Sequence, residues 1–270
     1  MAPKRPVVAL QLYTLRDLTK TDMAGALRQV AGMGYEGIEP AGFGNLTAPE
    51  IKNLCDELGL TVVGNHTGFE ALRNNFEAVV ADNQTLGNQF IVCPSIPAEQ
   101  RTAEGYKQFA QTLNEFGQKL RDAGMQLCYH NHAFEFEQFD GRYGLDILYE
   151  NSDPELVQAE IDTYWVQKGG VSPTEYIRKY AGRTPLIHVK DMADDEKQSF
   201  AEVGTGTLDW PSIFHAAEAG GAVAYIVEQD VCPGNPLDSV RLSLENLKKM
   251  GKLKSHINYR GTEAHRISVT

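Results

Sequence analysis

The sequence has little of what nucleic-acid-binding and membrane proteins carry. Its 270 residues include 25 lysines and arginines against 36 aspartates and glutamates, which gives a formal net charge of −11. Phosphate backbones and anionic membrane surfaces are both bound mainly through basic side chains, so this charge disfavours both partners. No apolar run approaches the length of a membrane-spanning helix. We therefore expect a small molecule as the partner, and neither nucleic acid nor a membrane.

Cysteine is scarce, and its placement gives no sign of a disulfide framework or a metal-binding motif. The four cysteines have no CxxC spacing; they are Cys55, Cys93, Cys128 and Cys232. Three of them stand in apolar stretches, where cysteine usually behaves as a small hydrophobic residue, and a reducing compartment follows. The N-terminus, MAPKRPVVALQLYTL, has a short basic head but no usable hydrophobic region and cleavage site. We expect a cytoplasmic protein, with a trimmed leader peptide left open.

Signature motifs of several other enzyme classes are missing. No GxGxxG follows the first apolar run, and no GxSxG is present, which disfavours an open doubly wound sheet and nucleophilic catalysis. The GTGTLDW stretch at 204–210 could cradle a phosphate, but it lacks the lysine and the serine or threonine of a P-loop. A glycine-rich stretch that ends in a helix-capping aspartate is more often a plain loop.

A regular alternation of two kinds of segment runs along the chain. Eight short apolar runs recur at even intervals, at 7–13, 36–40, 61–66, 90–94, 125–132, 157–162, 185–191 and 223–230. Segments with helical periodicity lie between them, such as the apolar stripe from Tyr106 to Leu120. This alternation predicts a single-domain (β/α)8 TIM barrel of the α/β class over residues 1–251. The extension at 252–270 could close the barrel, pack on a partner subunit in a homo-oligomer, or be loose.

Polar side chains collect where the apolar runs end, which is where a TIM barrel builds its active site. Four of the seven histidines belong to this group, which consists of Gln11, Tyr13, Glu39, His66, His130, His132, Glu160, Asp162, His188, Lys190, Glu228 and Asp230. Side chains two apart on a strand share a face. Three such pairs occur: His130 with His132, Glu160 with Asp162, and His188 with Lys190. If one member of a pair faces the barrel interior, so does the other.

Six polar groups crowded into one barrel mouth predict a bound cation. Burying them without compensation would cost much free energy, whereas carboxylates and neutral imidazoles become ligands when a divalent metal binds. A single strand-end histidine is more often structural, and Glu160 with Asp162 could simply be paired with Lys190. Their joint occurrence on one face favours the metal. Mixed imidazole and carboxylate ligands suit Mn²⁺, with Mg²⁺, Co²⁺ and Zn²⁺ as alternatives.

Motifs on these runs resemble the sugar phosphate isomerase/epimerase family of xylose isomerase-like TIM barrels. They are LQLYTLRD, GYEGIEPAG, YHNHAFEF, EIDTYWV, HVKD with VGTGTLDWPSIF, and IVEQD, and the resemblance covers residues 6–250. The family includes inosose dehydratase, ketose 3-epimerases and endonuclease IV. Endonuclease IV is similar in fold only, because it uses a trinuclear cluster and the negative charge of this chain opposes DNA.

The resemblance implies one divalent metal held by residues that end the fifth to eighth strands. Asp162, His188 and Glu228 match the family's ligands on the sixth to eighth strands. His130 stands where the ketose epimerases have a glutamate, and this H-x-H pattern is more similar to the inosose dehydratase branch. Glu160 or Glu135 could complete the metal shell instead.

The resemblance also implies a reaction, the metal-assisted removal of a proton beside a carbonyl of a keto-sugar or cyclitol, through an enediolate. The candidates for catalytic roles are Glu160, His132, Lys190 and Glu228. The candidates for substrate contacts are Gln11, Tyr13, Glu39, His66 and Glu135. Reprotonation would give an isomer or epimer, whereas loss of a neighbouring substituent would make the enzyme a lyase or dehydratase. A barrel that binds carbohydrate without turnover is the remaining alternative.

Overall fold

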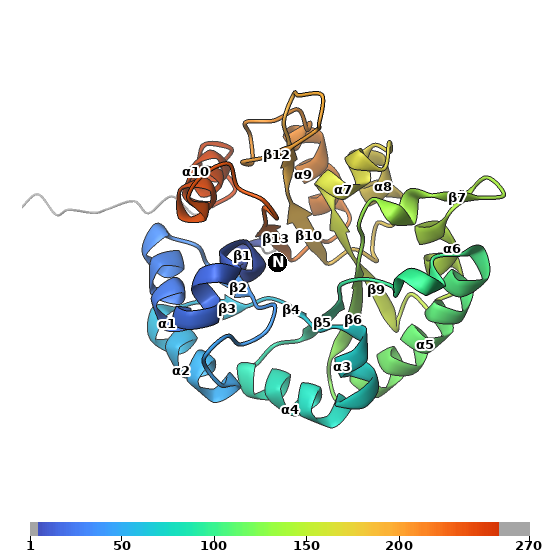
Figure 1. Ribbon diagram of the computed structural model, residues 1–270, viewed down its shortest axis with the longest axis horizontal. Coiled ribbons are helices and arrows are strands. Elements are labelled where there is room, and N and C mark those ends of the chain that lie inside the picture. The colour runs from blue at the N-terminus through green and yellow to red at the C-terminus, as the bar shows by residue number, and fades with distance from the viewer. Residues whose placement is uncertain (1–4, 254–270) are drawn as a thin grey trace, which may run out of the picture.

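The computed structural model describes residues 5–253, and its main sheet curls into a parallel barrel (Figure 1). The strand order is β3-β2-β1-β13-β10-β9-β6-β5-β4. The strands are β1 Val7–Gln11, β2 Gly37–Glu39, β3 Thr61–Val62, β4 Asn65–His66, β5 Phe90–Cys93, β6 Gln126–His130, β9 Val157–Asp162, β10 Leu186–Val189 and β13 Ala224–Val227. Each of these strands lies within one of the eight predicted runs, so the predicted TIM barrel is confirmed.

The barrel closes through the run at 61–66, which is interrupted at Val63 and Gly64 and so counts as two strands, β3 and β4. The first half pairs with β2 and the second half with β5. The interruption has a steric reason, because a Cβ atom on Gly64 would lie 2.2 Å from Oε1 of Glu39. A side chain at this position would therefore collide with a carboxylate inside the barrel.

Helices form a ring around the strands (Figure 1). The α-helices are α1 Arg16–Met33, α2 Ala48–Leu58, α3 Phe69–Asn74, α4 Phe76–Leu86, α5 Ala103–Asp122, α6 Gly144–Glu150, α7 Thr163–Lys168, α8 Pro173–Lys179, α9 Trp210–Ala219 and α10 Pro236–Lys249. No helix among residues 5–253 is long and apolar enough to cross a membrane. Apart from residues 252–253, the predicted C-terminal extension lies outside the described residues.

Periodicity and capping explain why these segments are helical. In α5 the predicted stripe of Tyr106, Phe109, Leu113 and Leu120 is buried against the barrel, as a 3.6-residue period requires. Asp209 caps α9 by accepting a hydrogen bond from the backbone N–H of Ser212. The same local rules place each helix between consecutive strands and leave the strand ends free to build a site.

Asp191 organises the glycine-rich loop that follows β10. This residue begins the short strand β11 (Asp191–Met192), and its carboxylate is fully buried. Its oxygens accept five hydrogen bonds of 2.8–3.2 Å, from the backbone N–H groups of Met192, Gly204, Gly206 and Leu208 and from the indole N–H of Trp210. The backbone N–H groups of Gly204 and Gly206 therefore already bind the carboxylate of Asp191. This agrees with the prediction that the stretch is a structural loop and not a phosphate-binding site.

Candidate metal centre

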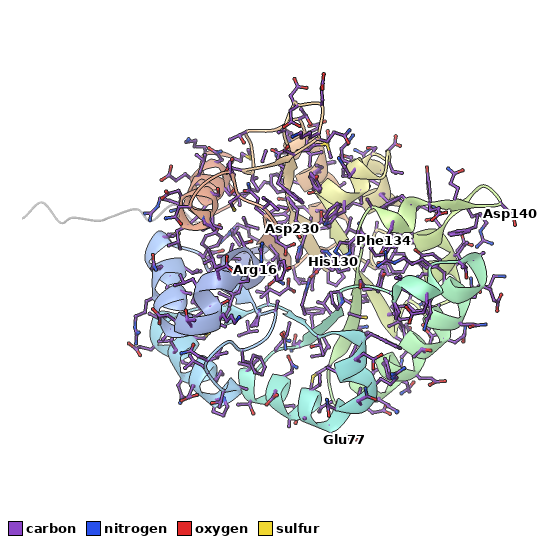
Figure 2. All side chains as sticks on the ribbon, in the orientation of Figure 1. Arg16, Glu77, His130, Phe134, Asp140 and Asp230 are labelled. Carbon is purple, nitrogen blue, oxygen red and sulfur yellow. The ribbon has the colours of Figure 1, made fainter. Side chains whose placement is uncertain are left out.

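A pocket of about 590 Å³ opens at the C-terminal ends of the barrel strands. Figure 2 shows His130 and Asp230 near the middle of the ring of helices, whereas Glu77 and Asp140 lie at its rim. The strand-end residues that line the pocket are Tyr13, His66, His130, His132, Glu228 and Asp230. The polar groups that the sequence places at strand ends thus meet at one mouth, on the side where the fold predicts the active site.

The three predicted pairs share their faces. The rings of His130 and His132 lie 5.0 Å apart, centroid to centroid, and both line the pocket. Glu160 and Asp162 both reach the His130 ring, at 2.9 Å and 3.8 Å. His188 Nδ1 and Lys190 Nζ both reach the same Glu228 oxygen, at 3.0 Å and 2.7 Å. Alternation along a strand therefore predicted the side-chain directions correctly.

Four of these side chains form an upper set that could hold a metal ion: His130, Asp162, His188 and Glu228. One nitrogen or oxygen of each lies within 4.8 Å of those of the other three. Individual separations are 3.8 Å from His130 Nε2 to Asp162 Oδ2, 3.9 Å from His188 Nδ1 to Asp162 Oδ2, and 3.0 Å from His188 Nδ1 to Glu228 Oε2. A metal about 2.1 Å from each ligand would separate neighbouring ligand atoms by roughly 3.0–4.2 Å, so the upper set has room for one.

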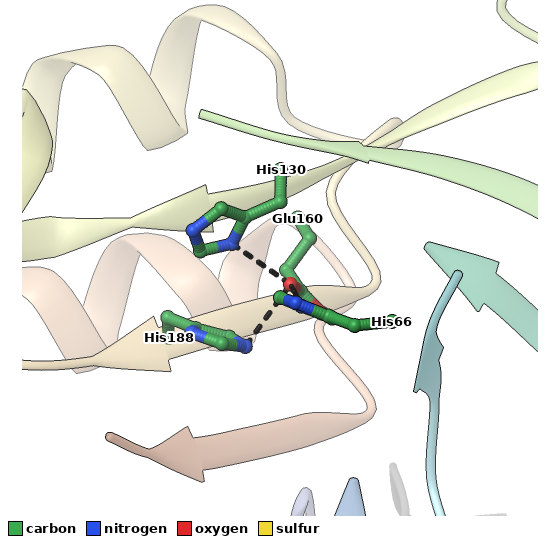
Figure 3. A group of neighbouring side chains, drawn as sticks. All are labelled: His66, His130, Glu160 and His188. Atoms are coloured by element: carbon green, nitrogen blue, oxygen red, sulfur yellow. Dashed lines mark hydrogen bonds and ion pairs between the residues drawn. The ribbon is translucent and has the colours of Figure 1, made fainter. Parts of the chain in front are cut away.

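A lower layer of carboxylates lies beneath the upper set. A single oxygen of Glu160, Oε1, lies 2.7 Å from His66 Nε2, 2.9 Å from His130 Nδ1 and 3.0 Å from His188 Nε2 (Figure 3). Glu39 Oε2 lies 2.8 Å from the same His188 nitrogen. Both carboxylates are fully buried. Each carboxylate thus accepts a hydrogen bond from the histidine ring nitrogen that points away from the upper set. Hydrogen bonds of this kind orient metal-binding imidazoles in other proteins.

A second group of side chains, His66, His130, Glu160 and His188, is also compact enough to hold an ion. Its imidazole nitrogens, however, already share the Glu160 oxygen at hydrogen-bonding distance. In the upper set, Asp162 Oδ2 is buried, lies 2.9 Å from Lys190 Nζ and accepts no well-directed hydrogen bond from the described residues. A buried carboxylate oxygen without a hydrogen bond is the kind of atom that a cation would satisfy. The upper set is therefore the better candidate.

Lys190 supplies the positive charge beside the upper set. Its fully buried ammonium lies 2.9 Å from Asp162, 2.7 Å from Glu228 and 2.6 Å from Asp230. Burial lowers the pKa of Lys190, but the three carboxylates outweigh burial and hold this pKa well above its usual value. Even so, burial raises the pKa of Asp162 to about 6. One ammonium does not balance the negative charge of three carboxylates. A divalent cation beside Asp162 would supply the missing positive charge.

The histidines differ in the charge that their surroundings favour. Burial lowers the pKa of His188, but the negative charge of Glu160 and the hydrogen bonds that the ring donates to Glu160, Glu228 and Glu39 raise this pKa well above its usual value. Burial instead lowers the pKa of His130 well below its usual value, and that of His132 to about 3. His130 and His132 are thus neutral imidazoles, which is the form that binds a metal or accepts a proton.

Three of the predicted substrate contacts lie below or beside the pocket instead of lining it. Glu39 is fully buried, and Gln11 donates a hydrogen bond of 2.9 Å to it. Glu135 is also fully buried, and its two oxygens accept hydrogen bonds from Tyr129 Oη at 2.7 Å and from the His132 backbone N–H at 2.8 Å. Glu39 and Glu135 instead contact residues that do line the pocket, since Glu39 Oε2 lies 3.4 Å from His66 Nε2 and Glu135 binds the His132 backbone.

Sequence reasoning assigned no role to two buried asparagines next to the site. Asn131 stands between the two histidines of the H-x-H pattern and accepts a hydrogen bond of 3.0 Å from the Asp162 backbone N–H. It therefore ties the loop after β6 to the end of β9. Asn65 precedes His66, points the other way, and lines the pocket. An asparagine inside an apolar run was the only signal for either residue.

We expect Glu135→Gln to change how stability depends on pH. Burial raises the pKa of Glu135 to about 7. Because the pKa of Glu135 is higher in the folded than in the unfolded protein, protonated Glu135 stabilises the fold. This contribution is fully present below the unfolded pKa of about 4.5, and about 3 kcal/mol of unfolding free energy is lost as pH rises toward 7. Glutamine keeps one acceptor for His132 and one donor for Tyr129, and it cannot ionise.

Urea unfolding of both proteins between about pH 4.5 and about pH 7.5 measures this effect. The variant should gain free energy of unfolding relative to the wild type as pH rises. A difference between the two proteins that stays constant with pH would show that Glu135 does not ionise inside the fold.

Comparisons with known proteins agree with this fold. The family model described as xylose isomerase-like TIM barrel matches residues 27–250. The inosose dehydratase of Clostridium perfringens is 27% identical over 208 residues, which are 70% of this chain and 65% of that protein. Among these curated relatives, the matched segment spans about half to two thirds of their length.

Solved structures show the same architecture. A sugar phosphate isomerase/epimerase from Parabacteroides distasonis superimposes with a TM-score of 0.80 at 25% identity, covering 94% of this chain and 98% of that one. The IolI protein, solved with a zinc atom, superimposes with a TM-score of 0.74 at 14% identity, over 92% of this chain and 99% of that one. From the family match and the barrel together, it follows that this chain belongs to the xylose isomerase-like TIM barrel family.

Proposed function

We propose that this protein is a divalent-metal-dependent enzyme that removes a proton beside the carbonyl of a keto-sugar or cyclitol. The proposal depends above all on the two-layered centre, in which Glu160 and Glu39 hold the far nitrogens of His130 and His188. That arrangement leaves His130 Nε2 and His188 Nδ1 facing Asp162 and Glu228 at the floor of a pocket. The family membership and the sugar isomerases and dehydratases among the similar proteins support the same chemistry.

His130, Asp162, His188 and Glu228 would hold the metal. When bound, the ion would polarise the substrate carbonyl as a Lewis acid and stabilise negative charge on its oxygen. Two imidazoles and two carboxylates suit Mn²⁺, Zn²⁺ or Co²⁺, and Mg²⁺ less well because it prefers oxygen ligands. The IolI protein, which has the same fold, was solved with a zinc atom, which supports a divalent ion as the cofactor.

His132 is the best-placed group to carry the proton. It lines the pocket, its Nδ1 is buried without a hydrogen-bond partner, and it stacks on Phe134 with an interplanar angle of 9°. A neutral ring held in one orientation can accept a proton from a substrate carbon at that nitrogen and return it, and negative charge developing on the substrate beside the ring would raise the low pKa of His132, which is about 3. Glu160, another candidate base, lies beneath three imidazoles and does not line the pocket. We assign Glu160 a positioning role.

Lys190 and Asp230 form the second proton-handling pair. The ammonium lies 2.6 Å from Asp230, whose side chain is 24% exposed at the pocket. A substrate hydroxyl or a leaving group that displaces Asp230 would meet a fully protonated amine, which can donate a hydrogen bond to developing negative charge. The pair thus suits an elimination as well as an isomerisation. The inosose dehydratases among the relatives favour elimination as the second candidate outcome.

Glu160→Gln tests the positioning role. We expect the metal affinity to fall by about 10–100-fold, as for other residues that orient metal-binding histidines. Glutamine can place its oxygen where Oε1 lies, but it removes the negative charge that the three imidazoles share, and its NH2 group would replace the unpaired Oε2. Titration of the metal-free protein with Mn²⁺ or Zn²⁺ measures the change. An unchanged affinity would contradict the two-layered centre.

Hydrogen–deuterium exchange at carbon tests the proposed function directly. The metal-loaded protein would be incubated in D2O with keto-pentoses, keto-hexoses and inososes, and the sugars analysed by mass spectrometry and NMR. We expect deuterium beside the carbonyl, with either an isomer or a dehydrated product. If the fully metal-loaded protein exchanged none of these substrates, a carbohydrate-binding barrel without catalysis would be the better description.

A further inference from the structure

The pocket is larger than the metal centre needs and continues in one direction. Beyond the strand ends its lining residues come from the loop after β2, from α3 and from α4, in a part we call the outer arm. Figure 1 shows where these elements lie around the barrel. The outer arm is lined by Phe43, Asn65, Ala71, Val79, Asp82 and Pro94. Covalently bonded heavy atoms pack more tightly than separate water molecules at ~30 Å³ each in the liquid, so a hexose of twelve heavy atoms fills roughly 200 Å³. The 590 Å³ of the pocket therefore has room for a second ring of similar size.

The outer arm contains a buried acceptor without a partner. Asn65 is 4% exposed, and its Oδ1 accepts no hydrogen bond from the described residues. The orientation of this amide is set by its neighbour, because its Nδ2 donates to Asn83 Oδ1 at 3.0 Å while Asn83 Nδ2 donates to the Val79 carbonyl at 2.8 Å. An unpaired buried acceptor is costly, so a donor from a ligand would stabilise the complex. The carboxylate of Asp82 adds a second acceptor nearby.

The remaining lining of the outer arm is apolar. Phe43, Ala71, Val79 and Pro94 offer hydrocarbon surface in the same part of the pocket as those acceptors. A sugar or other hydroxylated ring presents both of the groups that this lining requires, namely C–H faces for the hydrocarbon wall and hydroxyl donors for Asn65 and Asp82.

The charge of the lining opposes a phosphorylated substrate. Three carboxylates line the pocket, those of Asp82, Glu228 and Asp230, and within residues 5–253 no lysine or arginine does so. Phosphate groups in proteins are bound by such cations or by free backbone N–H groups at helix N-termini. The glycine-rich loop cannot supply those N–H groups, because Asp191 already accepts hydrogen bonds from Gly204 and Gly206.

We infer that the substrate is an uncharged glycoside, with a keto-sugar at the metal centre and a second hydroxylated ring in the outer arm. The identity of the first ring rests on the proposed function, whereas the second ring rests on the outer arm alone. For an elimination, the second ring would be the group that leaves. The base takes the proton from the carbon beside the carbonyl, and the electron pair forms a double bond to the next ring carbon. The bond from that next carbon to the bridging oxygen breaks, and the oxygen leaves with the second ring after taking up the proton that the base removed.

Calorimetric titration of the metal-loaded protein tests this inference without turnover. The probes are glucose, glucose 6-phosphate, and the uncharged disaccharides cellobiose, maltose and sucrose. We expect at least one disaccharide to bind at least tenfold more tightly than glucose, and glucose 6-phosphate to bind no more tightly than glucose. Either a uniform affinity for glucose and all the disaccharides or a clear gain from the phosphate would overturn the inference.

Val79→Trp should remove the advantage of the disaccharide by filling the outer arm from α4. We expect the ratio of disaccharide to glucose affinity to fall to about threefold or less. Ala78→Trp is the matched control, because the neighbouring side chain is exposed on the outer face of the same helix, and it should leave the ratio unchanged. Ala71→Phe, which enters the arm from α3, serves as a second variant if Val79→Trp does not fold. Equal losses for glucose and disaccharide would overturn the inference.

The two proposals fail in different ways. Suppose that a disaccharide binds tightly but that the same disaccharide carrying a ketone on one ring shows no carbon–deuterium exchange. This result would contradict the proposed chemistry and still support binding of a second ring in the outer arm. Exchange of simple keto-sugars with no advantage for disaccharides would support the chemistry and contradict the outer arm.

Discussion

Asp162→Asn is expected to lose the metal and, with it, carbon–deuterium exchange by a factor of about 10³ or more. Asp162 Oδ1 accepts the backbone N–H of Trp165 at 3.0 Å and so caps α7. Asparagine caps helices as well as aspartate does, so its oxygen would keep that role and its NH2 group would take the place of Oδ2. That NH2 group would face Lys190 and the upper set, where a ligand oxygen is needed. Loss of several kcal/mol of Lewis-acid stabilisation corresponds to the expected drop in rate.

Elemental analysis after dialysis, together with the exchange assay, measures this result. Asp209→Asn is the matched control, because Asp209 caps α9 in the same way but is exposed and far from the pocket lining. His132→Gln separates the two parts of the mechanism, since it should keep the metal and lose the exchange. If Asp162→Asn retained stoichiometric metal with unchanged affinity, the upper set would not be the metal site.

Asp191→Asn is expected to cost about 3–5 kcal/mol of unfolding free energy, the largest effect we expect from a single substitution outside the metal centre. Three N–H groups point at one oxygen of Asp191 and two at the other. Whichever way an asparagine amide turns, at least two of these donors would meet an NH2 group. Each buried donor that loses its acceptor costs about 1–3 kcal/mol.

Thermal and urea unfolding measure this loss, which should lower the melting temperature by roughly 10 °C. Fluorescence of Trp210 gives a local signal, because its indole N–H donates to Asp191 at 2.8 Å. Asp191→Ala removes the acceptor of all five donors and should be destabilised at least as much. Asp209→Asn, at the exposed N-cap of α9 that follows the same loop, should change stability by less than about 0.5 kcal/mol. If Asp191→Asn were as stable as the wild type, the loop would be held by other contacts.

Local patterns in the sequence were sufficient for the barrel and for the direction of its key side chains. The apolar runs mark strands because a buried parallel strand must be apolar on both faces. The alternation of side chains along such a strand placed Glu160 with Asp162, and His188 with Lys190, on the interior face. The residue types at the strand ends also predicted a cation, since histidines and carboxylates together in a barrel mouth need one. These conclusions depend on neighbours in the chain, which a sequence displays directly.

What only the tertiary structure decided is the depth of each residue in the barrel. His130 of β6 is in register with Glu160 of β9, whereas His188 of β10 is in register with Asp162, two residues further along β9. That stagger puts Glu160 beneath the imidazoles and Asp162 beside them, although both point inward. It also turns Glu39 and Gln11 into supports of His188. The stagger between strands arises from closing a tilted sheet into a barrel, and strands far apart in the chain carry no local mark of it.

The contacts of the loops and of the outer arm could not be predicted from local sequence patterns either. Asn65 of β4 meets Asn83 of α4 only through the packing of that helix against the barrel. Asp191 meets Gly204 and Gly206 only because the loop folds back toward β11. The residue types needed for chemistry are therefore written in the sequence of this protein. Which of them touch a ligand is decided by register and packing, because both depend on the closure of the whole barrel.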